Sequence, residues 1–200
     1  MPTVLAFDTA TARVSCCLWR DGEVLAERHA AHPRAAQGVL SLIDDVLGAA
    51  GVGRSEIEGV AVGVGPGSFT SVRIGIATAR GLALGLGVPV AGASSLAALR
   101  ASSAGAIAVI DARRGELFVA GPGRDPAVIT PAGLAAELAP GQTLVGDGAV
   151  RYRDVLACGS IEPDQSLVHA PSAAAIAERF RDRAPAEALY LRQPDATAVR

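Results

Sequence analysis

The predicted secondary structure repeats along the chain, and this repeat limits the folds that the chain can adopt. Apolar runs and turn residues in the first half predict three strands, a helix, a strand, a second helix and a short strand. The second half predicts three strands, a helix, a strand and a final helix in the same order. Each half opens on an apolar strand that ends in an aspartate, at Asp8 and at Asp111. We therefore expect an α/β protein of two lobes related by duplication, each with a mixed sheet flanked by helices.

The two halves meet at small residues near 102–105, which predicts an N-terminal lobe of residues 1–103 and a C-terminal lobe of residues 104–200. The predicted strands of the first lobe are 3–7, 14–19, 23–28, 60–64 and 88–90, its helices are 35–50 and 69–86, and a further helix begins at Ser94 or Ser95. The predicted strands of the second lobe are 106–111, 116–120, 127–129 and 144–145, and its helices begin at Thr130 and Ser172. Because the second half is short for this architecture, we expect its lobe to be reduced.

A glycine-rich loop joins strand 60–64 to helix 69–86. Gly65 and Gly67 permit backbone angles that other residues resist, and Ser68 is predicted to cap the helix with its side chain. Helix N-termini of this kind attract anions. Glycines at this place also close an ordinary strand-to-helix turn, and these residues alone favour that second interpretation.

Four blocks of residues, in order along the chain, resemble the TsaB (YeaZ) family of bacterial proteins, which takes part in the biosynthesis of threonylcarbamoyladenosine in tRNA. The blocks are Asp8-Thr9-Ala10-Thr11, then Gly65-Pro66-Gly67-Ser68-Phe69-Thr70 with Val72-Arg73-Ile74-Gly75-Ile76 and Gly81-Leu82-Ala83-Leu84-Gly85, then Asp111-Ala112-Arg113-Arg114-Gly115-Glu116, and Tyr190-Leu191-Arg192. Together they span nearly the whole chain. The resemblance implies the duplicated actin-like, Hsp70-like ATPase (ASKHA) fold.

The same resemblance implies a noncatalytic scaffold or activating subunit. Its partner is expected to be the catalytic paralogue TsaD, in a complex that forms N6-threonylcarbamoyladenosine beside the anticodon of ANN-decoding tRNAs. TsaE is expected to join a larger complex, and a homodimer is expected when the chain is alone. A stand-alone ATPase or small-molecule kinase of the same superfamily is the alternative, and a peptidase is a weaker one.

Composition narrows the chemistry that the chain can perform. All eighteen basic residues are arginines, so the chain holds neither a Walker A lysine nor a Schiff-base lysine. The histidines at 29, 32 and 169 have no spacing typical of a metal site, and we expect no metal. The formal net charge is −2 and the basic clusters are brief, so we expect tRNA to be bound only through the assembled complex.

The sequence also predicts a cytoplasmic protein without membrane contact. No uninterrupted apolar stretch approaches the roughly 20 residues that span a bilayer. The first residues lack a basic leader and reach Asp8 too early for a signal peptide. The cysteines at 16, 17 and 158 show no disulfide or metal pattern, which favours a reducing compartment.

The superfamily resemblance implies a nucleotide between the lobes, with phosphates near the turn that follows the first strand of each half. The residues that it implies for this cleft are Asp8, Thr9, Thr11, Asp111, Gly146 and Gly148. Alanines stand at 10 and 112, where active members have glycine, and their methyl groups argue against close phosphate contact. No cofactor is therefore predicted with certainty, and ATP or ADP stays open for the TsaB–TsaD complex.

The helix predicted at 69–86 is apolar on nearly every side. Between Ser71 and Leu86 its only charges are Arg73 and Arg80, and several glycines interrupt it. A helix buried on one side only would carry a charged stripe, so we expect a partner to cover the second side, together with helix 35–50. The candidate interface residues are Val39, Ile43, Val46, Ile74, Ala77 and Gly81.

Overall fold

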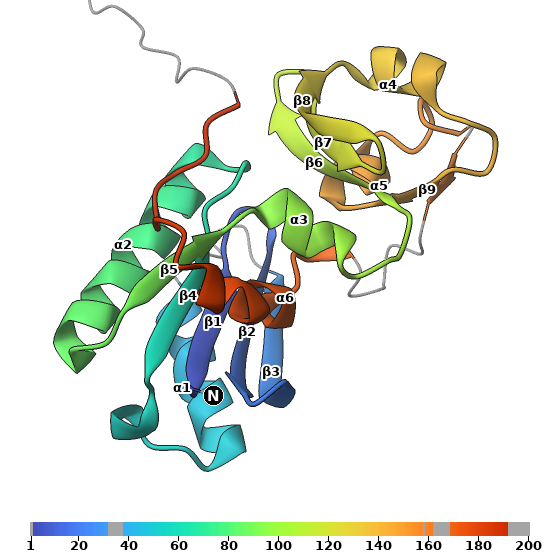
Figure 1. Cartoon of the computed structure of the whole chain (residues 1–200). Coiled ribbons are helices and arrows are strands. Elements are labelled where there is room, and N and C mark those ends of the chain that lie inside the picture. The colour runs from blue at the N-terminus through green and yellow to red at the C-terminus, as the bar shows by residue number, and fades with distance from the viewer. Residues whose placement is uncertain (1, 32–37, 158, 162–168, 192–200) are drawn as a thin grey trace, which may run out of the picture.

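The computed structural model describes residues 2–31, 38–157, 159–161 and 169–191. These residues form two lobes, each built on one five-stranded sheet (Figure 1). The first sheet uses strands from the first half of the chain and the second sheet uses strands from the second half, as the repeat predicts.

The first sheet has the strand order β3-β2-β1-β4-β5. Its strands are β1 (Val4–Asp8), β2 (Arg13–Arg20), β3 (Glu23–Ala31), β4 (Gly59–Gly63) and β5 (Val90–Ala93). The pairs β1–β2 and β2–β3 are antiparallel, and β1–β4 and β4–β5 are parallel. Asp21 and Gly22, both at positive φ, form the two-residue hairpin turn between β2 and β3, as the sequence predicts.

The second sheet repeats this topology in the order β10-β9-β6-β7-β8. Its strands are β6 (Ile107–Arg113), β7 (Glu116–Gly121), β8 (Arg124–Ile129), β9 (Thr143–Val145) and β10 (Ser160–Ile161). The pairs β6–β7 and β7–β8 are antiparallel, and β6–β9 and β9–β10 are parallel, as for the equivalent strands of the first sheet. The duplicated mixed-sheet fold is therefore confirmed.

Two longer helices, α1 (Val39–Ala50) and α2 (Phe69–Leu86), cover one face of the first sheet. Their counterparts α4 (Pro131–Glu137) and α5 (Asp147–Arg151) are much shorter, so the second lobe is reduced as expected. The predicted bounds of α2 match the structure. The predicted start of α1 near 35 lies outside the described residues, which show the helix from Val39.

The helix that ends each half packs on the sheet of the other half. Helix α3 (Ser95–Arg100) contacts β6 and β7, whereas α6 (Ala173–Glu178) and the 3-10 turn η4 (Arg179–Asp182) cover the free face of the first sheet. The remaining 3-10 turn, η2, is Arg54–Glu56. A boundary between residues 103 and 104 therefore separates the strands of the two sheets but not the helices that cover them, and it stays a prediction.

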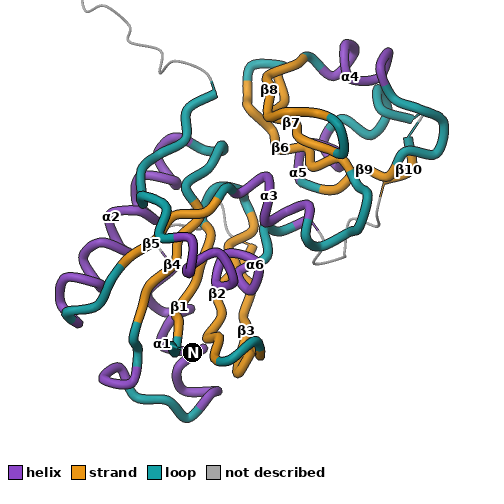
Figure 2. Tube along the Cα trace, in the orientation of Figure 1, coloured by secondary structure: helices purple, strands orange, loops and turns teal. Residues whose placement is uncertain are grey.

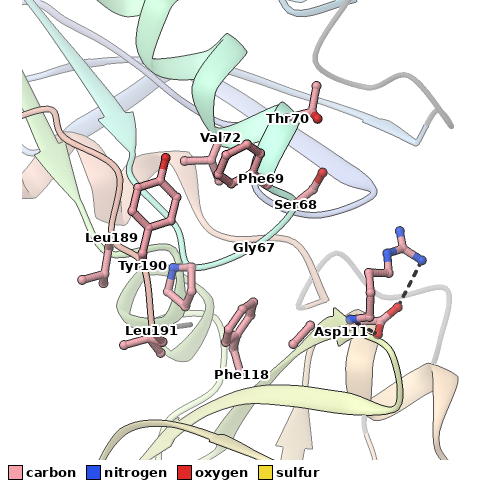
Figure 3. A pocket seen from close by; sticks show the side chains of 13 residues that line it. Gly67, Ser68, Phe69, Thr70, Val72, Asp111, Phe118, Leu189, Tyr190 and Leu191 are labelled. Atoms are coloured by element: carbon pink, nitrogen blue, oxygen red, sulfur yellow. Dashed lines mark hydrogen bonds and ion pairs between the residues drawn. The ribbon is translucent and has the colours of Figure 1, made fainter. Parts of the chain in front are cut away.

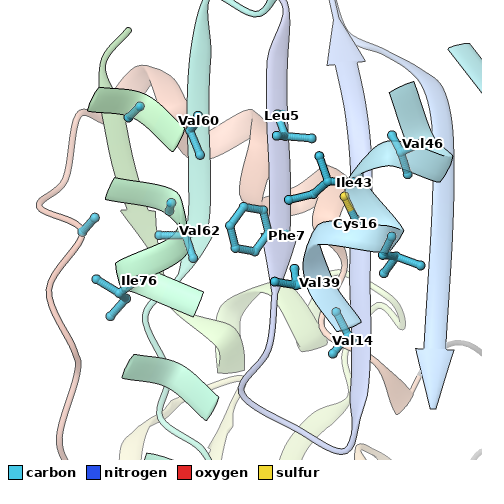
Figure 4. Packing of buried hydrophobic residues seen from close by; sticks show 14 of the residues in the cluster. Leu5, Phe7, Val14, Cys16, Val39, Ile43, Val46, Val60, Val62 and Ile76 are labelled. Atoms are coloured by element: carbon cyan, nitrogen blue, oxygen red, sulfur yellow. The ribbon is translucent and has the colours of Figure 1, made fainter. Parts of the chain in front are cut away.

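The larger core lies between the first sheet and helices α1 and α2 (Figure 4). Val39, Ile43 and Val46 are 1%, 4% and 0% exposed and point into this core from α1. The prediction that these three residues contact a partner is therefore wrong, because the sheet already covers the apolar face of α1.

In the described part of the chain, every helix is either too short or too polar to cross a membrane.

Candidate functional site between the two lobes

A pocket of about 420 Å³ lies between the lobes. It is lined by residues 66–70 and 72 of the first lobe, by 111–113 and 118 of the second, and by 189–191 of the returning C-terminal segment. In Figure 3 the rings of Phe69 and Phe118 face the pocket from opposite sides, with Tyr190 on one flank and Asp111 on the other. Three of the four sequence blocks thus line one pocket.

The fourth block, near Asp8, supports the pocket from behind. The backbone amide of Ser68 donates a hydrogen bond of 2.8 Å to the carbonyl of Ala10. A Cβ atom at Gly67 would clash with this carbonyl, so glycine is needed here for close approach. Gly65 adopts a φ of 90°, in the region that favours glycine. The predicted side-chain cap is wrong, because the Ser68 hydroxyl makes no capping hydrogen bond to α2.

An aromatic and arginine cluster fixes the C-terminal segment to α2. Arg73 Nε donates a 2.9 Å hydrogen bond to the Tyr190 hydroxyl, and the Arg73 guanidinium lies 3.8 Å from the centre of the Phe69 ring. The Leu189 amide also donates to the carbonyl of Val64 at 2.8 Å. Figure 2 shows this segment as loop that runs from α6 past β5 to the start of α2. Phe69 and Tyr190 were not predicted as site residues, although both stand in the sequence blocks.

Asp8 lies at the end of β1 and is fully buried. Its carboxylate accepts hydrogen bonds from the Ser95 hydroxyl at 2.5 Å and from the Ala10 amide at 2.7 Å. Burial raises the pKa of Asp8 to about 6, although both hydrogen bonds act in the opposite direction. Ser95 was expected only as an alternative helix cap, and Ser94 takes that place. Asp8 is therefore held inside the protein in this conformation.

The raised pKa of Asp8 makes stability depend on pH. The pKa of Asp8 is about 6 in the folded state against an ordinary value of 3.8, so Asp8 ionises first in the unfolded state as the pH rises. The contribution of Asp8 to the free energy of unfolding is therefore largest below pH 3.8. It is lost progressively as the pH rises to about 6. In Asp8→Asn, the free energy of unfolding should lose about 3 kcal/mol of its variation with pH, since one pKa unit corresponds to about 1.4 kcal/mol.

The measurement is the free energy of unfolding in urea at several pH values between about 4 and 7 for both proteins. Subtracting the two curves cancels the titration of every group that they share. Parallel curves would show that Asp8 does not carry the shift.

Thr9 and Thr11 are also buried, and their hydroxyls bond within the chain. The Thr9 hydroxyl donates to the carbonyl of Ser71 at 2.8 Å. The Thr11 hydroxyl donates to the carbonyl of Arg13 at 2.9 Å and accepts from the amide of Arg13 at 3.3 Å. Neither side chain lines the pocket between the lobes.

Asp111 is the one residue of the predicted nucleotide cleft that lines this pocket. Its carboxylate pairs with Arg113 at 3.2 Å and with Arg151 at 3.6 Å, and accepts from the Arg113 amide at 2.9 Å. Gly146 and Gly148 pack against the backbone of β6 instead of facing an open space. The six residues therefore do not form one open cleft, and nucleotide binding in an assembled complex stays a prediction.

The outer side of α2 is uncovered. Ala77 and Gly81 are exposed, Ile74 is half-buried, and Leu84 is 86% exposed. A Cβ atom at Gly81 would have no neighbour within 4 Å, and the same holds for Gly85. We call Ile74, Ala77, Gly81, Leu84 and Gly85 the α2 face. Gly75, by contrast, is buried against Thr9 inside the lobe.

Within the described residues, no group of three or more histidine, cysteine, aspartate or glutamate side chains is placed to hold a metal ion. His169 is buried, and its Nδ1 accepts a 2.8 Å hydrogen bond from the amide of Gly146. The residue at position 32 lies outside the described residues.

Two duplicated lobes with a pocket between them define an α/β protein of the actin-like, Hsp70-like fold. A family model described as TsaD, tRNA N6-adenosine threonylcarbamoyltransferase, matches residues 27–129. The chain belongs to this family. This match, together with the YeaZ structures described next, confirms the family resemblance drawn from the sequence blocks.

Solved structures agree with this assignment over nearly the whole chain. A Pseudomonas aeruginosa protein described as similar to the peptidase YeaZ is 30% identical, with a TM-score of 0.74, and the match covers 96% of this chain and 100% of that one. YeaZ from Pseudomonas aeruginosa is 29% identical, with a TM-score of 0.75 and the same coverage.

A more distant match shows the fold alone. Component A of the (R)-2-hydroxyglutaryl-CoA dehydratase of Acidaminococcus fermentans is 10% identical, with a TM-score of 0.54, over 91% of this chain and 100% of that chain. Comparison with curated protein sequences gave no match.

Proposed function

We propose that this chain is a noncatalytic scaffold or activating subunit that joins TsaD in the cytoplasm. The complex forms N6-threonylcarbamoyladenosine beside the anticodon of ANN-decoding tRNAs. The observation that carries the proposal is the likeness to YeaZ along nearly the whole chain, combined with the match to the TsaD family model. TsaE joins the larger complex, and tRNA is bound only through the assembly.

The α2 face supports this role, because it offers a surface for another helix. A side chain that is 86% exposed, such as Leu84, gains free energy when a partner buries it. Gly81 and Gly85 present bare backbone, so a partner helix can approach closely. We propose that TsaD covers this face in the complex, and that a second copy of the chain covers it when TsaD is absent.

The contacts within the chain favour a scaffold over a stand-alone ATPase or kinase. Asp8, Thr9 and Thr11 are buried and already bonded to other groups of the chain, so they do not offer donors or ligands to a nucleotide in this conformation. The pocket between the lobes offers the hydroxyls of Ser68 and Thr70, but the described residues that line it include no histidine, cysteine or lysine to activate these hydroxyls as in a peptidase.

The test of the proposed function is the modification itself. Deleting the gene should reduce N6-threonylcarbamoyladenosine in total tRNA at least tenfold, because TsaD without its scaffold turns over poorly, and a plasmid copy should restore it. Mass spectrometry of tRNA nucleosides measures the change. Synthesis of the threonylcarbamoyl-adenylate intermediate in extracts is the control and should not fall. Normal modification in the deletion strain would contradict the proposal.

A further inference from the structure

Asp147 lies between two glycines that fix its position. Gly146 has a φ of 117°, and a Cβ atom there would clash with the carbonyl of Val109. A Cβ atom at Gly148 would come within 2.9 Å of the Ile110 carbonyl carbon. These close approaches pack the backbone on both sides of Asp147 against strand β6. The two glycines thus serve to position the aspartate between them.

The carboxylate of Asp147 contacts backbone amides of both lobes. Its Oδ1 accepts a 3.0 Å hydrogen bond from the amide of Asp111, in β6 of the second lobe. The amide of Ala12, in the turn between β1 and β2 of the first lobe, also interacts with this carboxylate. A single side chain therefore connects the turn that follows β1 to the equivalent end of β6.

The superfamily resemblance places the phosphates of a nucleotide near these two turns. Backbone amides that converge on one point are the groups that bind a phosphate. Here an aspartate of the chain itself already accepts from them. We propose that the Asp147 carboxylate takes the place of a phosphate between the lobes and holds the lobes together, so that this cleft does not take a nucleoside phosphate.

The surrounding charges agree with this proposal. Burial raises the pKa of Asp147, whereas the amides of Asp111 and Ala12 and the charge of Arg113 act to lower it. The second carboxylate nearby, that of Asp111, is paired with Arg113 and Arg151. A phosphate that entered between the turns would lie near the carboxylates of Asp111 and Asp147, and the like charges would repel each other. The proposal is independent of the scaffold function.

The first experiment measures amide hydrogen exchange by NMR in Asp147→Ala. We expect the amides of Ala12 and Asp111 to exchange at least about tenfold faster, because both lose their acceptor, while those of Leu5 and Val60 keep their rates. Asp125→Ala, an exposed aspartate of the same lobe, is the matched control and should change neither pair. Unchanged exchange at Ala12 and Asp111 in a folded variant overturns the proposal.

The second experiment adds ligands to the same samples. Mg-ADP and inorganic phosphate should leave the amide shifts of Ala12 and Asp111 unchanged in the wild type. Phosphate at about 50 mM should shift them in Asp147→Ala, whose amides are free to bind an anion. Shifts in the wild type, or none in the variant, overturn the proposal.

A third protein keeps the proposal testable if Asp147→Ala does not fold. Asp147→Asn keeps one acceptor oxygen but removes the charge. In it the exchange at Ala12 and Asp111 should rise by less than in the alanine variant, and phosphate should shift both amides. Wild-type exchange rates and no response to phosphate in Asp147→Asn would contradict the role of the charge.

Discussion

Ala77→Arg is expected to lower the affinity for TsaD at least about 100-fold, which corresponds to about 3 kcal/mol. Ala77 lies near the middle of the α2 face, one helical turn before the bare backbone of Gly81. A partner helix that approaches this backbone closely leaves no room for an arginine side chain, and burying its charge without a partner would add a further cost. Size-exclusion chromatography of the co-expressed pair and titration of the purified proteins measure the loss.

A matched variant separates a local effect from a general one. Ala101→Arg adds the same side chain at an exposed alanine that follows α3, away from the α2 face, and should bind TsaD like the wild type. Far-UV circular dichroism should be unchanged in both variants, since both positions face solvent. If Ala77→Arg binds with wild-type affinity, the proposed interface is wrong. If the wild type itself does not bind TsaD, the proposed partner is wrong.

The fold could be predicted because local signals were strong and repeated. Helix α2 begins directly after the glycine-rich loop and ends at Gly87, which adopts a φ of 70°, so both ends are marked by residue type. Asp21-Gly22 allows the left-handed turn that the hairpin needs. Such signals depend only on residues close together in the chain, so the sequence is enough to predict these elements.

The exchange of helices between lobes could not be predicted, because it depends on long-range packing. Helix α6 is short and rich in alanine, and this pattern does not say which sheet it covers. In the structure Ala173, Ile176 and Ala177 pack on the first sheet beside Trp19. Nothing local distinguishes this choice from packing on the second sheet.

The candidate site was predicted only in part, because its contacts also depend on residues that are far apart in the sequence. Three of the four sequence blocks line the pocket between the lobes and the block at Asp8 lies behind it. The hydrogen-bond partner of Asp8 is Ser95, which lies 87 residues away in the sequence. An apolar face on α1 could belong to a core or to an interface, and the sheet buries Val39, Ile43 and Val46. On α2, Gly75 contacts Thr9 inside the lobe while Gly81 faces open space, so a contact of the Gly81 side with a partner stays a prediction.

Gly146→Ala is expected to destabilise the protein by about 4 kcal/mol, which combines backbone strain with overpacking. The φ of 117° and ψ of 165° at Gly146 lie in a region that is nearly closed to residues with a side chain. The added Cβ would clash with the Val109 carbonyl and lie 2.8 Å from Leu99 Cδ2. The carbonyl belongs to strand β6, so it cannot move away without disturbing the sheet.

Gly141→Ala is the control for a glycine with a positive φ but no clash. Gly141 also has a positive φ, of 75°, but a Cβ atom there would have no neighbour within 4 Å. Its replacement should therefore cost only about 1 kcal/mol of backbone strain. Urea unfolding followed by circular dichroism gives both values. A similar small loss in the two variants would mean that the loop at Gly146 shifts freely, and that the position of Asp147 between the lobes is not fixed by its neighbouring glycines.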